Sequence, residues 1–119
     1  LIGAGPILYN GIKAALELEK ENIHVLVINS HTIKPLDEKT IIWAAKLTKA
    51  VVTVEEHQVN GGLGSAVSEC LAQQYPVPME MIGMPGTFGQ SGQPEKLIEH
   101  YGMGVEAIKQ AIKKVLKRK

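Results

Sequence analysis

Three consecutive ionisable side chains, Glu55, Glu56 and His57, form the stretch of the sequence best suited to acid–base chemistry. A carboxylate beside an imidazole can bring the pKa of the imidazole towards neutrality, as general acid–base catalysis requires. Consecutive residues at a strand end point in different directions, however, so the three groups cannot converge on one substrate atom. We therefore expect one of them to cap a loop or a helix and another to face a neighbouring domain.

A glycine-rich turn follows these residues and opens the next helix, through Gly61, Gly62, Gly64 and Ser65. A helix N-terminus flanked by glycines can hold a phosphate or a carboxylate, and tight packing of the helix on the preceding strand is the simpler explanation. Nucleotide binding is not indicated. Neither this turn nor the turn that begins at Gly3 has the glycine spacing of a dinucleotide fingerprint, and no P-loop lysine follows either one.

The other reactive residue types do not form a recognisable site. His24, His31 and His100 lack the spacing of metal ligands. Cys70 lies on the apolar stripe of a predicted helix and is expected to be a small core residue. The basic stretch 113–119 is predicted to be a solvated helix end, where the helix dipole favours cations. On spacing and chemistry alone, the chain is a domain with one suggestive edge and not a self-sufficient enzyme.

Composition and net charge limit the classes of partner that the chain is expected to bind. The 119 residues suffice for one domain, and 13 basic against 12 acidic residues give a net charge of +1, so no bulk field favours nucleic acid or a membrane. Aromatic residues make up 4%, too few for a base-stacking surface. No transmembrane span or secretory signal is recognisable. A single cysteine excludes an internal disulfide and is compatible with a cytoplasmic protein.

The order of the predicted elements indicates the fold class. Strands alternate with helices, so we expect an α/β domain in which three layers, α/β/α, surround a mainly parallel sheet with strand order 2-1-3-4. The strands are predicted at 1–4, 23–29, 51–55 and 79–82, and the helices at 6–21, from Asp37 onwards, from 63 to about 75, at 94–100 and at 105–116, with a loop at 83–93.

Apolar spacing predicts the buried side of each helix. Asp37 is expected to be the N-cap of the second helix, with Leu36 and Ile41 as a hydrophobic staple. The stripes expected to face the sheet are Leu8, Ile12, Ala15 and Leu16 in the first helix, Ile41, Ala44, Ala45 and Leu47 in the second, Leu63, Ala66, Val67, Cys70 and Leu71 in the third, and Val105, Ile108, Ala111, Ile112 and Val115 in the last.

The predicted strand order brings two turns, 3–6 and 55–64, to the same edge of the sheet, where they would face each other. This edge is our candidate effector or interface site. Its residues are Gly3, Gly5, Glu55, Glu56, His57, Gly61, Gly62, Gly64 and Ser65. Leu1 begins inside a predicted strand, so we expect the chain to be a fragment of a longer chain or of a multi-chain enzyme.

Three segments, taken together, resemble a known family. Residues 29–37, 54–64 and 88–102 match, in order and spacing, the C-terminal domain of transketolases, and the resemblance extends over essentially the whole chain. The nearest form is the separately encoded C-terminal section of split bacterial and archaeal transketolases. The same domain is similar in 1-deoxyxylulose-5-phosphate synthase and in the β subunit of 2-oxo-acid dehydrogenases, while His57 and the Ser91-Gly92 pair favour transketolase.

The resemblance implies an enzyme that depends on thiamine diphosphate and transfers a two-carbon ketol unit between phosphosugars. In that family, N-terminal and pyrimidine-binding domains or subunits hold the cofactor and Mg²⁺, so no catalytic, cofactor-binding or metal residue is carried onto this chain. The resemblance also implies a homo-oligomer and an additional antiparallel edge strand upstream of residue 1. The isolated domain is expected to be inactive and to support folding and dimer assembly.

Two readings from other classes stay open at this point. The chain could be an effector-binding module that encloses a small anion between the turns at 3–5 and 55–64. It could also be a free-standing interaction domain of flavodoxin-like shape.

Overall fold

The fold is a four-stranded parallel sheet between two layers of helices. The structure, a computed structural model, describes residues 1–30, 36–58, 62–84 and 104–119. The strands, in spatial order β2-β1-β3-β4, are β1 (Ile2–Gly3), β2 (Ile28–Asn29), β3 (Val51–Gln58) and β4 (Met79–Met84). The helices are α1 (Leu8–Glu19), α2 (Glu38–Thr48), α3 (Leu63–Gln74) and α5 (Val105–Lys117). The predicted fold class and strand order are confirmed.

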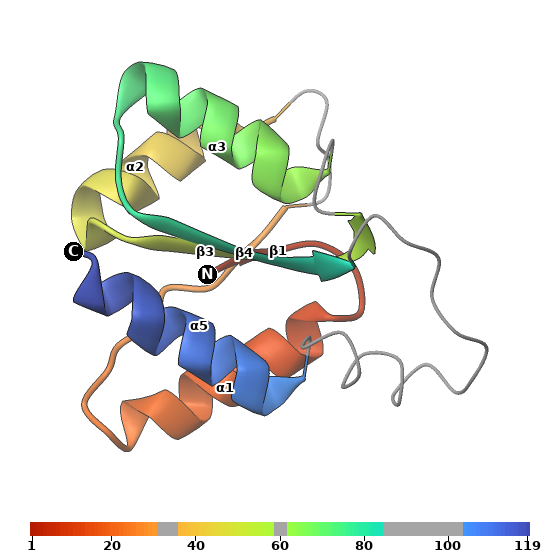
Figure 1. Ribbon diagram of the computed structural model, residues 1–119. Helices are drawn as coiled ribbons and strands as arrows, with labels where there is room; N and C mark the ends of the chain where they lie inside the picture. Colours follow the sequence, from red (N-terminus) through yellow and green to blue (C-terminus); the bar gives the residue numbers. More distant parts are fainter. Residues whose placement is uncertain (31–35, 59–61, 85–103) are drawn as a thin grey trace.

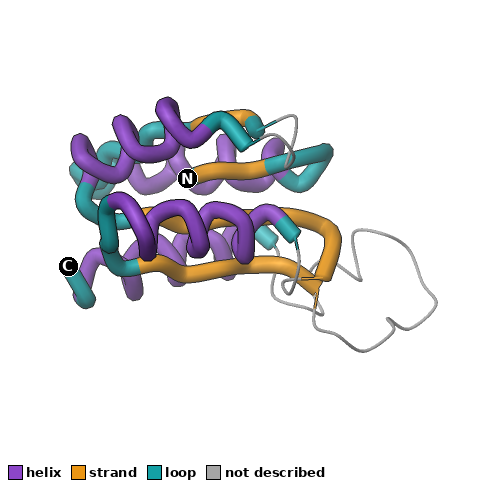
Figure 2. Tube along the Cα trace, turned by 90° about the horizontal axis from the view of Figure 1, so that it is seen from above, coloured by secondary structure: helices purple, strands orange, loops and turns teal. Residues whose placement is uncertain are grey.

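The helices cover both faces of the sheet in pairs. In Figure 1, α1 and α5 lie on one face, and α2 and α3 lie on the other. The strand order places β2 and β4 at the two edges of the sheet, and Figure 2 shows the sheet and its helices from above. Each face has its own apolar core. One consists of Ile7, Leu8, Ala14, Leu18, Val52, Val54, Ile108, Ile112 and Val115, and the other of Ile2, Ile41, Ala45, Val51, Leu63, Val67 and Leu71.

The start of α2 follows the predicted capping pattern. The Asp37 carboxylate accepts hydrogen bonds from the backbone N–H of Thr40 at 3.2 Å and from the Thr40 hydroxyl at 2.7 Å. These bonds, the one from the hydroxyl first, lower the pKa of Asp37. Ile41 is buried and Leu36 packs against the same core. The N-cap assignment is therefore confirmed, since the side chain satisfies an N–H group that has no partner within the helix.

The bounds of the strands differ from the prediction. The strand expected at 23–29 is confined to β2 (Ile28–Asn29) because β1, its neighbour, consists of two residues that pair with those two. The ladder ends where Leu1 N donates to the Leu26 carbonyl at 2.8 Å. In the other direction, β3 and β4 extend beyond the expected ends, and their final pair lies past an irregularity in the register.

The apolar stripe expected for α1 is wrong in part. The buried residues are Leu8, Gly11, Ala14 and Leu18, whereas Ile12 is 41% exposed and Leu16 is 60% exposed. Gly11 explains the rotation: a Cβ there would lie 2.7 Å from Leu1 Cδ2, so the helix approaches the sheet through its glycine. On α2, Ile41, Ala44 and Ala45 are buried as expected, but Leu47 is 63% exposed.

The other helix predictions hold where the structure describes them. α3 and α5 bury most of the predicted residues, with Ala66, Val105 and Ala111 half-buried. Of the loop expected at 83–93, residues 83 and 84 belong to β4, and the rest lies outside the described residues. The helix expected at 94–100, together with His31, His100 and the 88–102 segment of the resemblance, also lies outside them.

The basic end of α5 contacts the edge strand β4. Arg118 donates to the carbonyl oxygen of Met79 at 2.6 Å and to the carboxylate of Glu80 at 3.0 Å. Lys114 pairs with the other oxygen of Glu80 at 2.9 Å. The helix end is solvent-exposed as expected, and two of its cations are in addition paired with the sheet.

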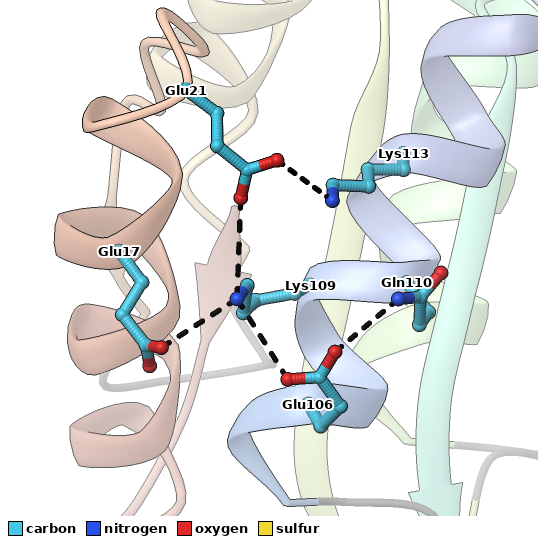
Figure 3. A network of polar contacts seen from close by, with 6 residues as sticks. All are labelled: Glu17, Glu21, Glu106, Lys109, Gln110 and Lys113. Carbon is cyan, nitrogen blue, oxygen red and sulfur yellow. Dashed lines mark hydrogen bonds and ion pairs between the residues drawn. The ribbon is translucent and has the colours of Figure 1, made fainter.

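Helices α1 and α5 are joined by the ionic network of Figure 3. The Lys109 ammonium lies 3.5 Å from Glu17, 3.7 Å from Glu106 and 4.0 Å from Glu21. Lys113 pairs with the second oxygen of Glu21 at 2.9 Å. Desolvation alone would lower the pKa of Lys109, but the three carboxylates outweigh it and raise this pKa. The hydrogen bond from Lys113 is the main cause that lowers the pKa of Glu21.

We expect Glu21→Gln to lower the thermal stability of the domain at neutral pH. Because the pKa of Glu21 is lower in the folded state, its contribution is present above the ordinary value of 4.5 and is lost as the pH falls through the folded value. The melting temperatures of wild type and variant should therefore converge as the pH is lowered below 4.5. Glu19→Gln, an exposed change at the last residue of α1 and outside the network, is the control. A gap that stays constant down to low pH would contradict the ion-pair explanation.

Candidate functional site

The candidate site lies at the carboxyl edge of the two central strands. Gly3 pairs in register with Val54, and the Ala4 N–H donates to the Val54 carbonyl at 3.3 Å. The turn after β1 is thus adjacent to the point where Glu55 follows in β3. Gly5 in this turn has φ +81°, a conformation that side-chain-bearing residues adopt rarely. The residue after β1 and Glu55 therefore lie at the same edge of the sheet.

The carboxylate of Glu55 is bound to the start of α3. Its Oε1 accepts the backbone N–H of Leu63 at 2.9 Å, and its Oε2 accepts the backbone N–H of Gly64 at 2.8 Å. The residue is 1% exposed. These N–H groups belong to the first turn of the helix, where no carbonyl of the helix can accept them, and the positive end of the helix dipole favours the negative charge. Glu55 therefore links the end of β3 to the beginning of α3.

This contact determines which anion the turn holds. The sequence allowed a phosphate or carboxylate at residues 61–65 or tight packing of the helix on the strand. In the structure, the N–H groups of Leu63 and Gly64 donate to a carboxylate of the same chain. The result agrees with the expectation that one of the three ionisable residues caps a helix, and that residue is Glu55.

Close packing accompanies the ionic contact. A Cβ on Gly64 would lie 2.9 Å from Met81 Sδ and 2.9 Å from Thr53 Oγ1, so only glycine fits without rearrangement. Thr53 is fully buried, and its hydroxyl has no hydrogen-bond partner among the residues that the structure describes. Sequence reasoning missed Thr53. The available signal was its position two residues before Glu55 in a buried strand, which places both side chains on the face covered by α3.

The remaining candidate residues surround this contact without converging on it. Glu56 is half-buried and follows Glu55 in β3, so strand alternation directs it to the opposite face. His57 belongs to β3 as well. Gly62 is the extended N-cap of α3, and Ser65 is half-buried in its first turn. Gly61 lies outside the described residues.

The arrangement offers neither a metal centre nor an activated thiol within the described ranges. Among residues 1–30, 36–58, 62–84 and 104–119, no cluster of His, Cys, Asp and Glu has the size and geometry to hold a metal ion. Cys70 is buried, and burial, reinforced by Glu38, raises the pKa of its thiol, which disfavours the reactive thiolate. None of the helices in these ranges has the length and apolarity needed to cross a bilayer.

Comparisons with known proteins agree with one another. Residues 1–108 match the family described as "Transketolase, C-terminal domain". All of the chain aligns, at 39% identity over 119 residues, with 37% of the 6-deoxy-6-sulfo-D-fructose transketolase subunit SqwH of Clostridium sp. (strain MSTE9). With 1-deoxy-D-xylulose-5-phosphate synthase of Desulfitobacterium hafniense (strain DSM 10664 / DCB-2), it is 39% identical over 122 residues, which are 99% of this chain and 19% of that enzyme.

A solved structure extends this similarity to three dimensions. The chain superimposes on a split gene transketolase, described as an inactive beta4 tetramer, with a TM-score of 0.93 and 40% identity. The match covers 98% of this chain and 38% of that one. The chain therefore spans well under half the length of the relatives it matches.

We expect Glu55→Gln to reduce the free energy of unfolding by about 2 kcal/mol, because a buried N–H donor is left facing the new amide NH₂ group. Chemical denaturation of the variant and of wild type measures the difference. Glu56→Gln is the matched control at the neighbouring position and should change stability by less than about 0.5 kcal/mol. Equal effects of the two substitutions would contradict the role assigned to Glu55.

Thr53→Val should leave stability unchanged or raise it by about 1 kcal/mol, since it replaces a buried hydroxyl without a partner by an isosteric methyl group. Thr48→Val provides the comparison, because the Thr48 hydroxyl lies 2.8 Å from the Ala44 carbonyl oxygen and 3.0 Å from that of Ala50. This second variant should lose about 1 kcal/mol. A loss at Thr53 as large as that at Thr48 would mean that the Thr53 hydroxyl has a stabilising partner.

Proposed function

The chain belongs to the transketolase C-terminal domain family, and we propose that it serves as the C-terminal section of a transketolase, which transfers a two-carbon ketol unit between phosphosugars. The observation that carries the proposal is the match of nearly the entire fold to a split gene transketolase, at a TM-score of 0.93 and 40% identity. The chain is then one domain of a longer subunit or of a multi-chain enzyme. We also propose that the protein is located in the cytoplasm.

The role of this domain within the enzyme is proposed to be structural. It supports folding and dimer assembly, and it has no chemistry when isolated. The use of Glu55 supports this role: the best-placed carboxylate at the sheet edge is buried and bound to backbone N–H groups of α3, where it cannot exchange protons with a substrate. A general acid or base needs access to the reacting atom.

Thiamine diphosphate and Mg²⁺ are proposed to be held by the other domains of the parent enzyme. The start of α3 would be the natural cradle for a diphosphate on this chain, because helix N-termini bind such groups through free N–H donors. The donors of Leu63 and Gly64 are already engaged by Glu55. The described residues therefore do not fit the diphosphate, and no catalytic step is assigned to them.

The carboxyl edge is proposed to face the other parts of the enzyme. Its residues Gly3, Gly5, Glu56 and His57, with the turn at 61–65, would contact the N-terminal and pyrimidine-binding domains or subunit. The assembly is proposed to be a homo-oligomer. The similarity to a subunit of a sulfofructose transketolase and to a chain of a split gene transketolase supports an arrangement in which this fold works together with further polypeptide.

A second candidate within the same superfamily is the C-terminal domain of 1-deoxyxylulose-5-phosphate synthase, which the 39% identity to such an enzyme favours. The β subunit of a 2-oxo-acid dehydrogenase is a further alternative from the sequence resemblance. The effector-binding alternative has less support, because the N–H groups of Leu63 and Gly64, which the start of α3 would offer to an anionic ligand, already donate to Glu55.

Reconstitution tests the proposal. We expect this chain, combined with the remaining domains of its enzyme, to support ketol transfer from xylulose 5-phosphate to ribose 5-phosphate, whereas the chain alone should be inactive. Condensation of pyruvate with glyceraldehyde 3-phosphate is the control reaction, and activity there instead would assign the domain to a 1-deoxyxylulose-5-phosphate synthase. Calorimetric binding of thiamine diphosphate with Mg²⁺ to the isolated chain would overturn the view that other domains hold the cofactor.

A further inference from the structure

Met81 is an exposed methionine whose sulfur also packs against a buried residue. It lies in the edge strand β4 and is 44% exposed. Its thioether nevertheless contacts the start of α3, because a Cβ on the buried Gly64 would lie only 2.9 Å from Met81 Sδ. Exposure makes a methionine open to oxidation, and a packed contact gives its sulfur a structural role that oxidation can remove. Met81 combines both properties.

A groove beside β4 gives small molecules access to this side chain. The groove has a volume of about 310 Å³, and Met81, Met79, Ser68 and Leu71 are among the residues of β4 and α3 that line it. Met79 lines the same groove, but it is half-buried and packs against the apolar core on this face of the sheet. A peroxide in the solvent should therefore react with Met81 before it reacts with Met79.

The side of the sulfur that faces α3 has no room for another atom. Thr53 pairs in register with Met81, and a Cβ on Gly64 would lie 2.9 Å from Thr53 Oγ1 as well as 2.9 Å from Met81 Sδ. An oxygen atom added to the sulfur must therefore point towards the groove, where water can hydrate it. Because a sulfoxide is polar and the thioether is apolar, the oxidised side chain is better solvated when it leaves the contact with Gly64.

We propose that Met81 is an oxidation site and that its modification loosens the start of α3. Hydrogen peroxide transfers one oxygen atom to the Met81 sulfur: the O–O bond breaks, an S=O bond forms, the sulfur is oxidised, and the peroxide is reduced to water. The sulfoxide turns towards the groove, so the start of α3 loses the side chain that packs on Gly64. This inference does not depend on the proposed function, and its test uses no enzymatic assay.

The test is oxidation of the full chain with hydrogen peroxide, followed by peptide mass mapping and thermal unfolding. We expect Met81 to be converted to the sulfoxide several-fold faster than Met79. The oxidised chain should melt roughly 4 °C below the untreated chain, because the loss of one packing contact has an effect of this size in a small domain. Amide hydrogen exchange at Leu63 and Gly64 should become about fivefold faster, since these amides belong to the loosened turn.

Two leucine variants separate Met81 from the other oxidisable residues. Met81→Leu keeps an apolar side chain of similar volume without a sulfur atom, so peroxide should leave its melting temperature unchanged. Met79→Leu is the matched control and should lose as much stability on oxidation as wild type does. Equal losses in wild type and Met81→Leu, a faster reaction at Met79 than at Met81, or formation of the Met81 sulfoxide without a change in melting temperature would overturn the proposal.

Enzymatic reduction provides a second measurement that needs no variant. Methionine sulfoxide reductases of types A and B, supplied with a thiol reductant, return both epimers of the sulfoxide to methionine, whereas sulfinic and sulfonic acids formed at Cys70 would stay oxidised. We expect this treatment to restore the melting temperature and the exchange rates at Leu63 and Gly64. A loss of stability that persists once mass mapping shows Met81 to be reduced would assign the effect to another residue and overturn the proposal.

Discussion

The buried contact between Glu55 and the start of α3 is the constraint on which this edge of the domain depends. A carboxylate at the end of a central strand satisfies two N–H groups that the helix itself leaves without acceptors. The same contact fixes the direction in which α3 leaves the sheet, and Gly64 allows the helix to approach Thr53 and Met81 closely. Polar and apolar packing therefore specify the same position of α3, which is the consistency expected of a unique native state.

The opposite face is held together in a different way. Helices α1 and α5 bury apolar residues against β3, with Ile82 of β4 packed against the same core. Lys109 and Lys113 of α5 join the helix to Glu17 of α1 and to Glu21. Exposed ion pairs are individually weak, so this network adds to a contact that the apolar core already determines. The carboxylate of Glu55 is thus buried between the sheet and α3. The charged side chains that join α1 and α5 lie at the surface instead, where their interactions respond to pH and salt.

Much of the fold could be predicted because local signals agreed with one another. The Asp37 cap, the β-branched run at Val51–Val54 and the glycines after β3 each indicate a boundary, and the alternation of strands and helices restricts the topology. The face of α1 could not be predicted in this way. Ile12 and Leu16 satisfy the helical period, but the close approach at Gly11 is a tertiary contact that periodicity does not contain. The pairing of Glu55 with α3 is also tertiary, and the sequence indicated only that a residue of this group should cap something.

Helix α5 also has a consequence for the open edge of the sheet. β4 is an edge strand, and the backbone groups of such strands can pair with those of other molecules. Arg118 occupies the carbonyl oxygen of Met79, and together with Lys114 it gathers charge around Glu80 at that edge. The basic end of the helix thus engages one of the backbone acceptors of β4 and surrounds that part of the strand with charged side chains, which is a way in which proteins make edge strands unfavourable for pairing. A chain shortened before Arg118 would keep its core and yet lose part of its resistance to aggregation.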